Sequence, residues 1–245
     1  AGRYATGSFN TFVGFSAGRG ATSAPYGSGD YNTAMGYNAH YAFTTGKQNV
    51  AIGWEAAKSL TTGYYSTFLG VRAGRSVTTG NTNTFIGWQS GYAVTTTSNK
   101  IAVGYRAGYA DGGEMDVFIG YEAGLNVTAG DNIGIGRSAG RGYHGVGQTE
   151  FQANTTNRYN VSIGSFAGNR VIGTANIHIG YKAGMNATGS SNTFMGYEAG
   201  LGATDSAPYS SGTLNVALGY QALKGFTTGT ANIVIGNLAA TALTT

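Results

Sequence analysis

A short repeat runs through the chain, and the stretch from Asn49 to Gly87 shows it most clearly. It reads NVAIGWEAAKSLTTG, then YYSTFLGVRAGRSVTTG, then NTNTFIG. Each unit has a β-branched residue, any residue, an aliphatic residue and a glycine, then usually an aromatic residue, a small pair and a Thr-Thr-Gly turn. A fixed period of this length is typical of stacked repeat architectures, so it limits the possible folds more than any other feature.

Thirteen glycines anchor the repeat, and most are spaced 16 or 17 residues apart. We number positions from this glycine: position −1 is always Val, Ile, Leu or Met, and position −3 is always Thr, Val or Ile. Position +1 is aromatic in nine units, and position +3 is Ala except at Ser90. The anchoring glycines are Gly14, Gly36, Gly53, Gly70, Gly87, Gly104, Gly120, Gly136, Gly164, Gly180, Gly196, Gly219 and Gly236.

The residues around the glycine have the pattern of a strand. Positions −3, −1 and +1 are two apart, so in a strand they share one apolar face, while position −2 is mostly Ala or Phe on the other. A strand that is apolar or small on both faces is normally covered on both, here by its own coil and by a neighbouring chain. A unit of 16 or 17 residues is too short for a helix plus a strand with connections. We therefore predict an all-β, repetitive parallel β-solenoid or β-roll of about 13 coils, each with two short strands and two turns.

Two positions predict how the coils stack. Position −4 is Asn in ten units, which predicts a ladder of amide hydrogen bonds: Asn10, Asn32, Asn49, Asn83, Asn132, Asn160, Asn176, Asn192, Asn215 and Asn232. Position +2 carries opposite charges in adjacent units, which predicts weak ion pairs between Glu55 and Arg72, Arg106 and Glu122, and Lys182 and Glu198. The alternative is that these charges are separately solvated.

Composition narrows the class of protein. The 245 residues include 43 glycines and no cysteine, and the apolar residues fall in strict columns rather than in polar tracts, which disfavours collagen, disorder and disulfide scaffolds. No apolar run approaches the roughly 20 residues of a membrane span, so no membrane insertion is predicted. The net charge is +4 and the basic residues are spread along the chain, so no nucleic-acid partner is predicted.

The chain reads as a single repetitive domain, 1–245, with insertions at 19–31, 141–159 and 202–214. Residues 1–62 also align with 183–245 after one inserted residue, so a longer repeat of about 182 residues overlies the short one. The chain begins and ends in the middle of a coil. We therefore expect a segment of a longer fibre, or a subunit that stacks end to end.

The sequence lacks a convincing catalytic or metal motif. His40, His144 and His178 are far apart and lack metal-ligand spacing, so no metal, cofactor or enzymatic activity is predicted. Asp111, Glu114 and Asp116 could form a glycosidase pair or a loose calcium site, but turn residues in a degenerate coil are the favoured interpretation. The insertions carry the candidate contacts for a cell-surface glycan: Tyr26, Tyr143, His144, Tyr159 and Tyr209. Simple packing of these loops against the solenoid is the competing interpretation.

Three segments carry a resemblance to known fibres: Val50-Ala51-Ile52-Gly53, Ile101-Ala102-Val103-Gly104 and Val216-Ala217-Leu218-Gly219. They resemble the head repeats of trimeric autotransporter adhesins, which form left-handed parallel β-rolls in a homotrimer. The longer pattern, NTFIGWQSGYAVTTT or NTFMGYEAG, is more similar to phage tail-fibre repeats. This resemblance implies an extended homotrimer used for host attachment. The coil is longer than the usual adhesin repeat, and the sequence contains no C-terminal chaperone or membrane anchor.

These observations favour a non-enzymatic fibre or shaft protein of a phage tail fibre or extracellular filament. Such a protein would lie outside the cell or on a virion surface, and its partner would be itself, as a homotrimer or an end-to-end polymer. A bacterial surface adhesin head is the main alternative. A polysaccharide-degrading spike, which needs the carboxylates, and an ice-binding solenoid, which needs the Thr rows, are further alternatives.

Overall fold

The computed structural model describes residues 1–23, 26–110, 112–142, 157–203, 210–241 and 243. The chain divides into two compact units, Ala1–Asp116 (unit 1) and Val117–Thr245 (unit 2), which we describe separately. Within the described residues every strand is three residues long and ends just before an anchoring glycine. Unit 1 contains β1 (Thr11–Val13), β2 (Thr33–Met35), β3 (Val50–Ile52), β4 (Thr67–Leu69), β5 (Thr84–Ile86) and β6 (Ile101–Val103). Unit 2 contains β7 (Val117–Ile119), β8 (Ile133–Ile135), β9 (Val161–Ile163), β10 (Ile177–Ile179), β11 (Thr193–Met195), β12 (Val216–Leu218) and β13 (Ile233–Ile235).

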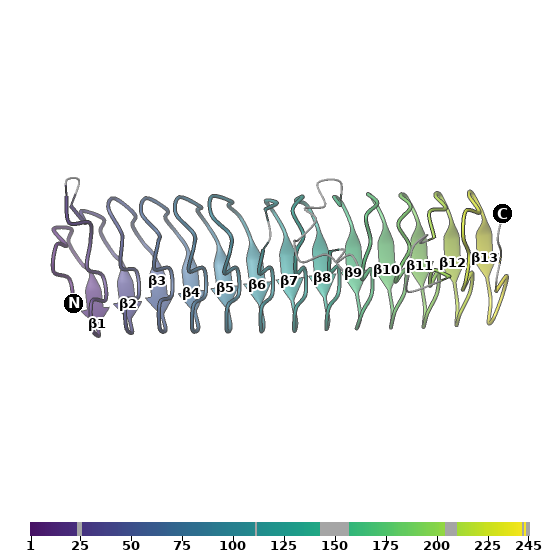
Figure 1. Ribbon diagram of the computed structural model, residues 1–245, viewed down its shortest axis with the longest axis horizontal. Coiled ribbons are helices and arrows are strands. Elements are labelled where there is room, and N and C mark those ends of the chain that lie inside the picture. The colour runs from purple at the N-terminus through teal and green to yellow at the C-terminus, as the bar shows by residue number, and fades with distance from the viewer. Residues whose placement is uncertain (24–25, 111, 143–156, 204–209, 242, 244–245) are drawn as a thin grey trace, which may run out of the picture. The chain divides into compact units, whose positions relative to one another are not determined.

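Within each unit the strands lie side by side in sequence order, and every pair is parallel (Figure 1). The register keeps equivalent positions together, as Thr67↔Thr84 and Phe68↔Phe85 show in unit 1. Each coil thus adds one strand to a parallel sheet and returns to start the next. The predicted all-β parallel β-solenoid is confirmed. The described residues include no helix with the length and hydrophobicity of a membrane span.

The return path of each coil differs from the prediction of a second strand. It makes hydrogen bonds between coils, for example from Thr61 N to Thr78 O (2.8 Å), but among the described residues it has only isolated parallel bridges. The reason is backbone conformation: positions −5, +2 and +4 are left-handed, as at Arg72 (φ 58°) and Gly74 (φ 57°), and a strand needs an extended run. The two bridges, Ala5↔Gly27 and Ala187↔Ser210, occupy equivalent places in the longer repeat.

The core lies inside each coil and is built from positions −2, +3 and +7. Phe68, Ala73 and Val77 of one coil are all fully buried, and Phe68 packs against Phe85 of the next coil with ring centroids 5.7 Å apart. Position +4 lies directly over the position −2 side chain. A Cβ on Gly74 would lie 2.2 Å from the Phe68 ring, so a coil with Phe at position −2 requires Gly at position +4.

Buried asparagines connect the coils along the inside of the turn before the strand. The Oδ1 of Asn32 accepts a hydrogen bond from the backbone N–H of Asn49 (3.0 Å), and Asn49 Oδ1 accepts one from the N–H of Ser66 (3.1 Å). The Asn49 amide also donates to Gly63 O in the turn (2.8 Å). In unit 2 the same bonds run from Asn132 through Asn232. Each step satisfies a backbone donor that would otherwise be buried without a partner.

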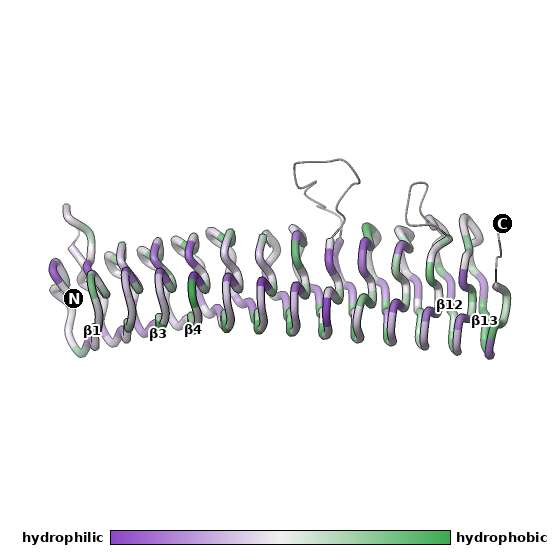
Figure 2. The backbone as a smooth tube through the Cα atoms, turned by 60° about the horizontal axis from the view of Figure 1, so that its bottom comes forward, coloured by the Kyte–Doolittle hydropathy of each residue, from purple (hydrophilic) through white to green (hydrophobic). Residues whose placement is uncertain are grey.

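Hydrophobic residues recur in successive coils (green in Figure 2). Position −2 points inward: where it is hydrophobic it is at most 8% exposed, as at Ala51 and Phe118, except for the half-buried Phe12 in the first strand. Positions −3 and −1 point outward from the same strand. The face that we expected a neighbouring chain to cover is thus the outer face of the sheet.

Candidate functional site

The outer face of the sheet carries an aliphatic residue at position −1 of every described strand and Thr, Val or Ile at position −3. At position −1 in unit 1, Val13, Met35 and Leu69 are 49%, 45% and 42% exposed. In unit 2 the same position leaves Ile119, Ile135 and Leu218 39%, 37% and 44% exposed. Monomeric soluble proteins rarely expose contiguous apolar patches larger than a few hundred Å². We call this surface, positions −3 and −1 of successive strands, the apolar sheet face.

Aromatic side chains at position +1 border the apolar sheet face and stack on one another along the coils. Trp88 and Tyr105 lie with ring centroids 4.7 Å apart at an interplanar angle of 12°. In unit 2, Tyr181, Tyr197 and Tyr220 continue the arrangement with centroid separations of 5.1 and 5.2 Å. Stacked rings turn their flat faces toward each other, so they present mainly edges to a ligand.

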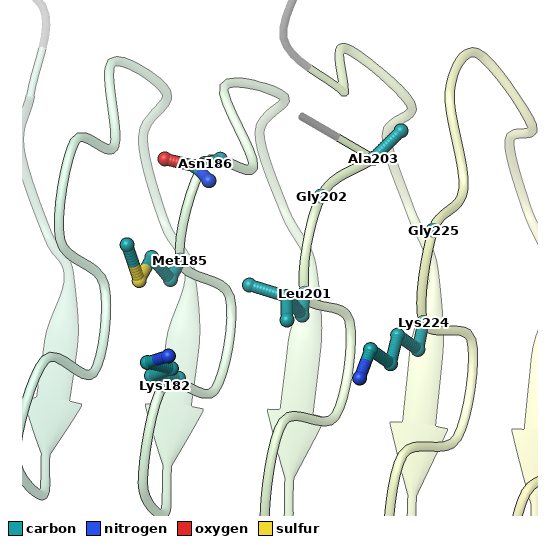
Figure 3. Close-up of a pocket in the computed structure, with 8 residues that line it drawn as sticks. All are labelled: Lys182, Met185, Asn186, Leu201, Gly202, Ala203, Lys224 and Gly225. Carbon is teal, nitrogen blue, oxygen red and sulfur yellow. The ribbon is translucent and has the colours of Figure 1, made fainter. Parts of the chain in front are cut away.

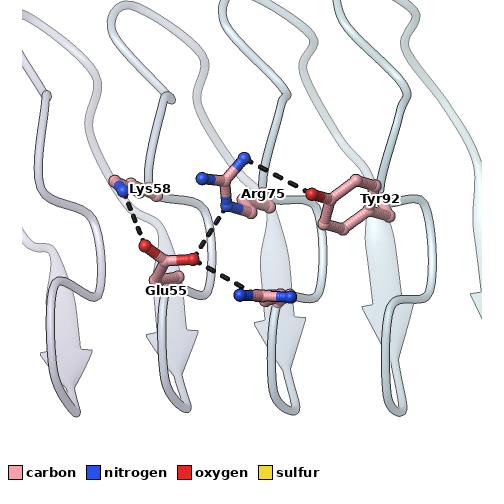
Figure 4. A network of polar contacts seen from close by, with 5 residues as sticks. Glu55, Lys58, Arg75 and Tyr92 are labelled. Atoms are coloured by element: carbon pink, nitrogen blue, oxygen red, sulfur yellow. Dashed lines mark hydrogen bonds and ion pairs between the residues drawn. The ribbon is translucent and has the colours of Figure 1, made fainter.

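Charged side chains at positions +2 and +5 form a network in unit 1 (Figure 4). The Glu55 carboxylate accepts hydrogen bonds from Lys58 Nζ (2.6 Å), Arg75 Nε (2.8 Å) and Arg72 Nε (3.3 Å). Burial raises the pKa of Glu55, but the hydrogen bonds and charges of Lys58 and Arg75 outweigh it and lower the pKa from 4.5 to about 2. Glu55 therefore stays ionised and holds three cations on one surface.

The cations of this surface also stack on tyrosines. The Arg75 guanidinium lies over the Tyr92 ring (5.7 Å to the centroid), and Arg106 lies over Tyr109 (4.5 Å). At the other end of the surface, Arg19 lies over both Tyr4 and Tyr41, at 5.4 and 5.0 Å. We define the basic ridge as the position +5 residues of unit 1 together with its charged position +2 residues: Arg3, Arg19, Tyr41, Lys58, Arg75, Tyr92, Tyr109, Glu55, Arg72 and Arg106.

A groove of about 550 Å³ lies along one end of the basic ridge. The residues that line it are Arg3, Phe15, Ser16, Arg19, Tyr37, Asn38, Tyr41 and Lys58. They include three cations and no carboxylate. Among the described residues, no ion pair joins Arg3 or Arg19, whereas Lys58 is bonded to Glu55.

Unit 2 has a groove at the equivalent place in the longer repeat (Figure 3). Met185 and Leu201 stand there where unit 1 has Arg3 and Arg19, and Lys224 stands where unit 1 has Tyr41. Lys224 Nζ donates to the Glu198 carboxylate (2.6 Å). Burial raises the pKa of Glu198, but the bonds from Lys224 and Gln221 lower it by more, so its pKa falls below the usual value. One scaffold thus carries a cationic groove in unit 1 and a more apolar one in unit 2.

The insertion residues predicted to contact a glycan are only partly described. Tyr26 is 48% exposed next to the bridge residue Gly27 in unit 1. Tyr159 is 58% exposed at position −5 of a coil in unit 2, with the Arg158 guanidinium 5.2 Å from its ring centroid. Tyr143, His144 and Tyr209 lie outside the described residues. The hypothesis of glycan stacking at the insertions therefore stays a prediction.

Two histidines are buried inside the coils. His40 at position +4 packs on Phe43, and His178 at position −2 packs near Phe194, with ring centroids 4.9 and 5.8 Å apart. Both are fully buried, and desolvation lowers the pKa of each from 6.5 to about 3. They belong to different units and are neutral core residues in this structure.

The three candidate carboxylates have different environments. Glu114 is exposed, whereas Asp116 is fully buried at position −4 with Oδ2 3.7 Å from Lys100 Nζ. Asp111 lies outside the described residues. Lys100 and Asp116 replace two asparagines of the ladder, so this carboxylate lies within the packing between coils.

The basic ridge is the surface that reasoning along the sequence missed. Its cations are 14 or more residues apart in the chain except for Arg72 and Arg75, so they look scattered until they are read at the repeat period. Position +2 alone predicts the Glu55–Arg72 ion pair, which is confirmed at 3.3 Å, and reading position +5 in the same way would have found the rest of the ridge. Comparison of the chain with protein-family models, with curated proteins and with solved structures found no match.

Proposed function

We propose that this protein is a structural shaft that self-associates through the apolar sheet face, as a homotrimer, in a fibre used for attachment. The observation that carries the proposal is the exposure of an aliphatic side chain at position −1 in coil after coil. A β-solenoid fold is compatible with a shaft, because coils added along an axis extend the molecule at roughly 4.8 Å per strand.

Burial of this face would be favourable for a simple reason. Transfer of apolar surface out of water is worth roughly 25 cal/mol per Å², and within each unit every coil contributes to the apolar sheet face. Three copies could bury one face each around a common axis. The resemblance of the repeats to phage tail-fibre repeats supports a position on a virion surface or in an extracellular filament.

The test is the molar mass in solution, measured by light scattering on the eluting protein. We expect a mass near three times 25.1 kDa. A double variant, Leu69→Lys with Ile135→Lys, places one charge on the apolar sheet face of each unit and should give a folded species near 25.1 kDa. The control is Thr62→Lys, at an exposed turn position, which should leave the mass unchanged.

Two results would contradict this proposal. A wild-type mass near 25.1 kDa at micromolar concentration would exclude self-association as the role of the face. An unchanged oligomer in the double variant would place the interface elsewhere on the protein.

A further inference from the structure

We propose that the basic ridge of unit 1 binds a linear acidic polysaccharide, a chain of sugars that carry carboxylate or sulfate groups. The inference deepens the proposed function and rests on it only for its biological setting, because it names what a shaft of this kind would hold. The binding itself depends on unit 1 alone.

The first argument is the segregation of charge. The basic ridge holds six cations and one carboxylate, a net charge of +5. Unit 1 as a whole has eight cations and five carboxylates, a net charge of +3, so the remainder of the unit is net negative. Clustering of one sign of charge on one surface attracts a polyanion and raises its local concentration.

The second argument is periodicity. In unit 1, position +5 is a cation at Arg3, Arg19, Lys58 and Arg75 and a tyrosine at the other three places, and neighbouring coils are spaced at roughly 4.8 Å. A polymer with a regularly repeated anionic group can therefore follow the ridge from coil to coil. Arginines suit this role because their planar guanidinium groups bind carboxylate or sulfate oxygens through paired hydrogen bonds.

The third argument is the arrangement of the aromatic rings, which favours a polysaccharide over a single-stranded nucleic acid. Tyr92 and Tyr109 are stacked with centroids 5.2 Å apart and planes 9° from parallel. Arg75 and Arg106 cover the same rings. Sequence-tolerant binding of single strands relies on open ring faces on which bases stack. Here ring edges and guanidinium groups face the ligand, and these suit hydroxyl and anionic groups.

The fourth argument is the groove at Arg3 and Arg19, which gives the ridge a concave end. Cations dominate its lining, and no ion pair with a described residue neutralises Arg3 or Arg19. In the equivalent groove of unit 2, Met185 and Leu201 occupy these two places. The coil therefore accommodates Met in place of Arg3 and Leu in place of Arg19, and these two substitutions give a variant that copies unit 2 of the same chain.

The experiment measures binding of the full chain to immobilised polygalacturonate and dextran sulfate, with neutral dextran as the reference. We expect binding to the two acidic polymers, weakened by salt, and none to dextran. Arg3→Met with Arg19→Leu should weaken binding about tenfold, whereas Lys47→Gln, which removes an exposed charge outside the ridge, should change it less than twofold. Arg19→Leu alone removes one positive charge, as Lys47→Gln does, and its loss of affinity should lie between those of Lys47→Gln and the double variant. Equal effects of Arg19→Leu and Lys47→Gln, or no binding of the wild type at low salt, would overturn the proposal.

Duplex and single-stranded DNA form a second arm of the experiment. Tighter binding of either DNA than of both polysaccharides, lost in the same double variant, would overturn the proposal in favour of a nucleic-acid surface. The molar mass of every sample is recorded in parallel. Binding by a 25.1 kDa species would support polysaccharide binding by the basic ridge and contradict the trimeric shaft. A trimer that binds neither polymer would support the trimeric shaft and contradict polysaccharide binding.

Discussion

At the scale of single residues, the coil depends on side chains that compensate for one another's size. Phe at position −2 is accompanied by Gly at position +4, as in Phe68 with Gly74. Ala at position −2 is accompanied in three coils by a larger residue at position +4: Ala34 with His40, Ala51 with Ala57, and Ala217 with Leu223. Both members of each pair are inside the coil, so they share one volume.

This compensation predicts a strong coupling between Phe68 and Gly74. Gly74→Leu alone should destabilise the fold by more than about 3 kcal/mol, because its Cβ already meets the Phe68 ring. Phe68→Ala alone should lower the free energy of unfolding by about 3 to 5 kcal/mol, because it leaves a cavity in the core. The double variant, which reproduces the Ala217 and Leu223 pair, should cost less than Gly74→Leu alone. Urea unfolding of all four proteins measures the coupling, and additive costs would refute it.

The buried histidines predict a pH dependence. The pKa of His178 is about 3 when folded and 6.5 when unfolded, so the unfolded chain takes up the proton first as the pH falls. The contribution of the neutral His178 side chain to the free energy of unfolding is therefore fully present above about pH 6.5. It is lost as the pH falls toward 3, at about 1.4 kcal/mol per pH unit. His40 behaves in the same way.

His178→Phe provides the matched variant, because Phe occupies position −2 of the next coil at Phe194, also with Gly at position +4. We expect the free energy of unfolding of this variant to fall less steeply between pH 6.5 and 5, by about 1.4 kcal/mol per pH unit. The measurement is urea unfolding at several pH values. Parallel curves for the variant and the wild type would show that His178 does not titrate as its burial requires.

At the scale of the coil, position −4 is the element that ties one strand to the next. Ser66 replaces an asparagine and keeps the ladder intact, since its Oγ accepts from the N–H of Asn83 (3.0 Å). Lys100 and Asp116 replace two successive asparagines with a buried ion pair, and Lys100 N–H still donates to Asn83 Oδ1 (3.1 Å). A buried pair loses hydration free energy that its mutual attraction only partly restores.

We therefore predict that Lys100→Ala destabilises the protein by about 3 to 5 kcal/mol, because it leaves the Asp116 charge buried. The double variant Lys100→Asn with Asp116→Asn restores the repeat residue at both places and should be within about 1 kcal/mol of the wild type, or more stable. Thermal and urea unfolding of the three proteins would decide. A double variant as unstable as Lys100→Ala would show that the ion pair has a role that amides cannot fill.

At the scale of the whole molecule, the repeat places each kind of chemistry on its own surface of the coils. Within each unit, aliphatic residues at position −1 lie on the apolar sheet face, and aromatic residues at position +1 lie along its border. In unit 1 the charges at positions +2 and +5 form a third surface. The proposed self-association and the proposed ligand binding use different positions of the repeat, so we expect the variants designed for one to leave the other intact.

The sequence alone was sufficient to predict the stack of parallel strands, because the same pattern of residues recurs in every coil. Each of the thirteen described strands is three residues long, has an inward-facing residue at position −2 and is followed by a glycine. Because the glycines recur at the same place, as at Gly70 and Gly87, the pattern can be recognised in the sequence. The asparagine column follows from the same periodicity, although its bonds run mainly from an amide oxygen to a backbone N–H of the next coil. The missing second strand could not be predicted, since left-handed backbone at non-glycine residues such as Glu55 and Arg72 has no reliable signature in the sequence.

The tertiary structure decided which surface each column occupies. The Glu55–Arg72 pair was predicted from position +2 of the repeat, but only the stacked coils show that Lys58 and Arg75 reach the same carboxylate. The tertiary structure also places Asp116 inside the coil, whereas the sequence favoured a turn residue at this position. Local sequence determines the conformation of a coil, because its turns and strand depend on nearby residues. The neighbours of a side chain, in contrast, belong to the coils packed above and below it, so they are known only from the tertiary structure.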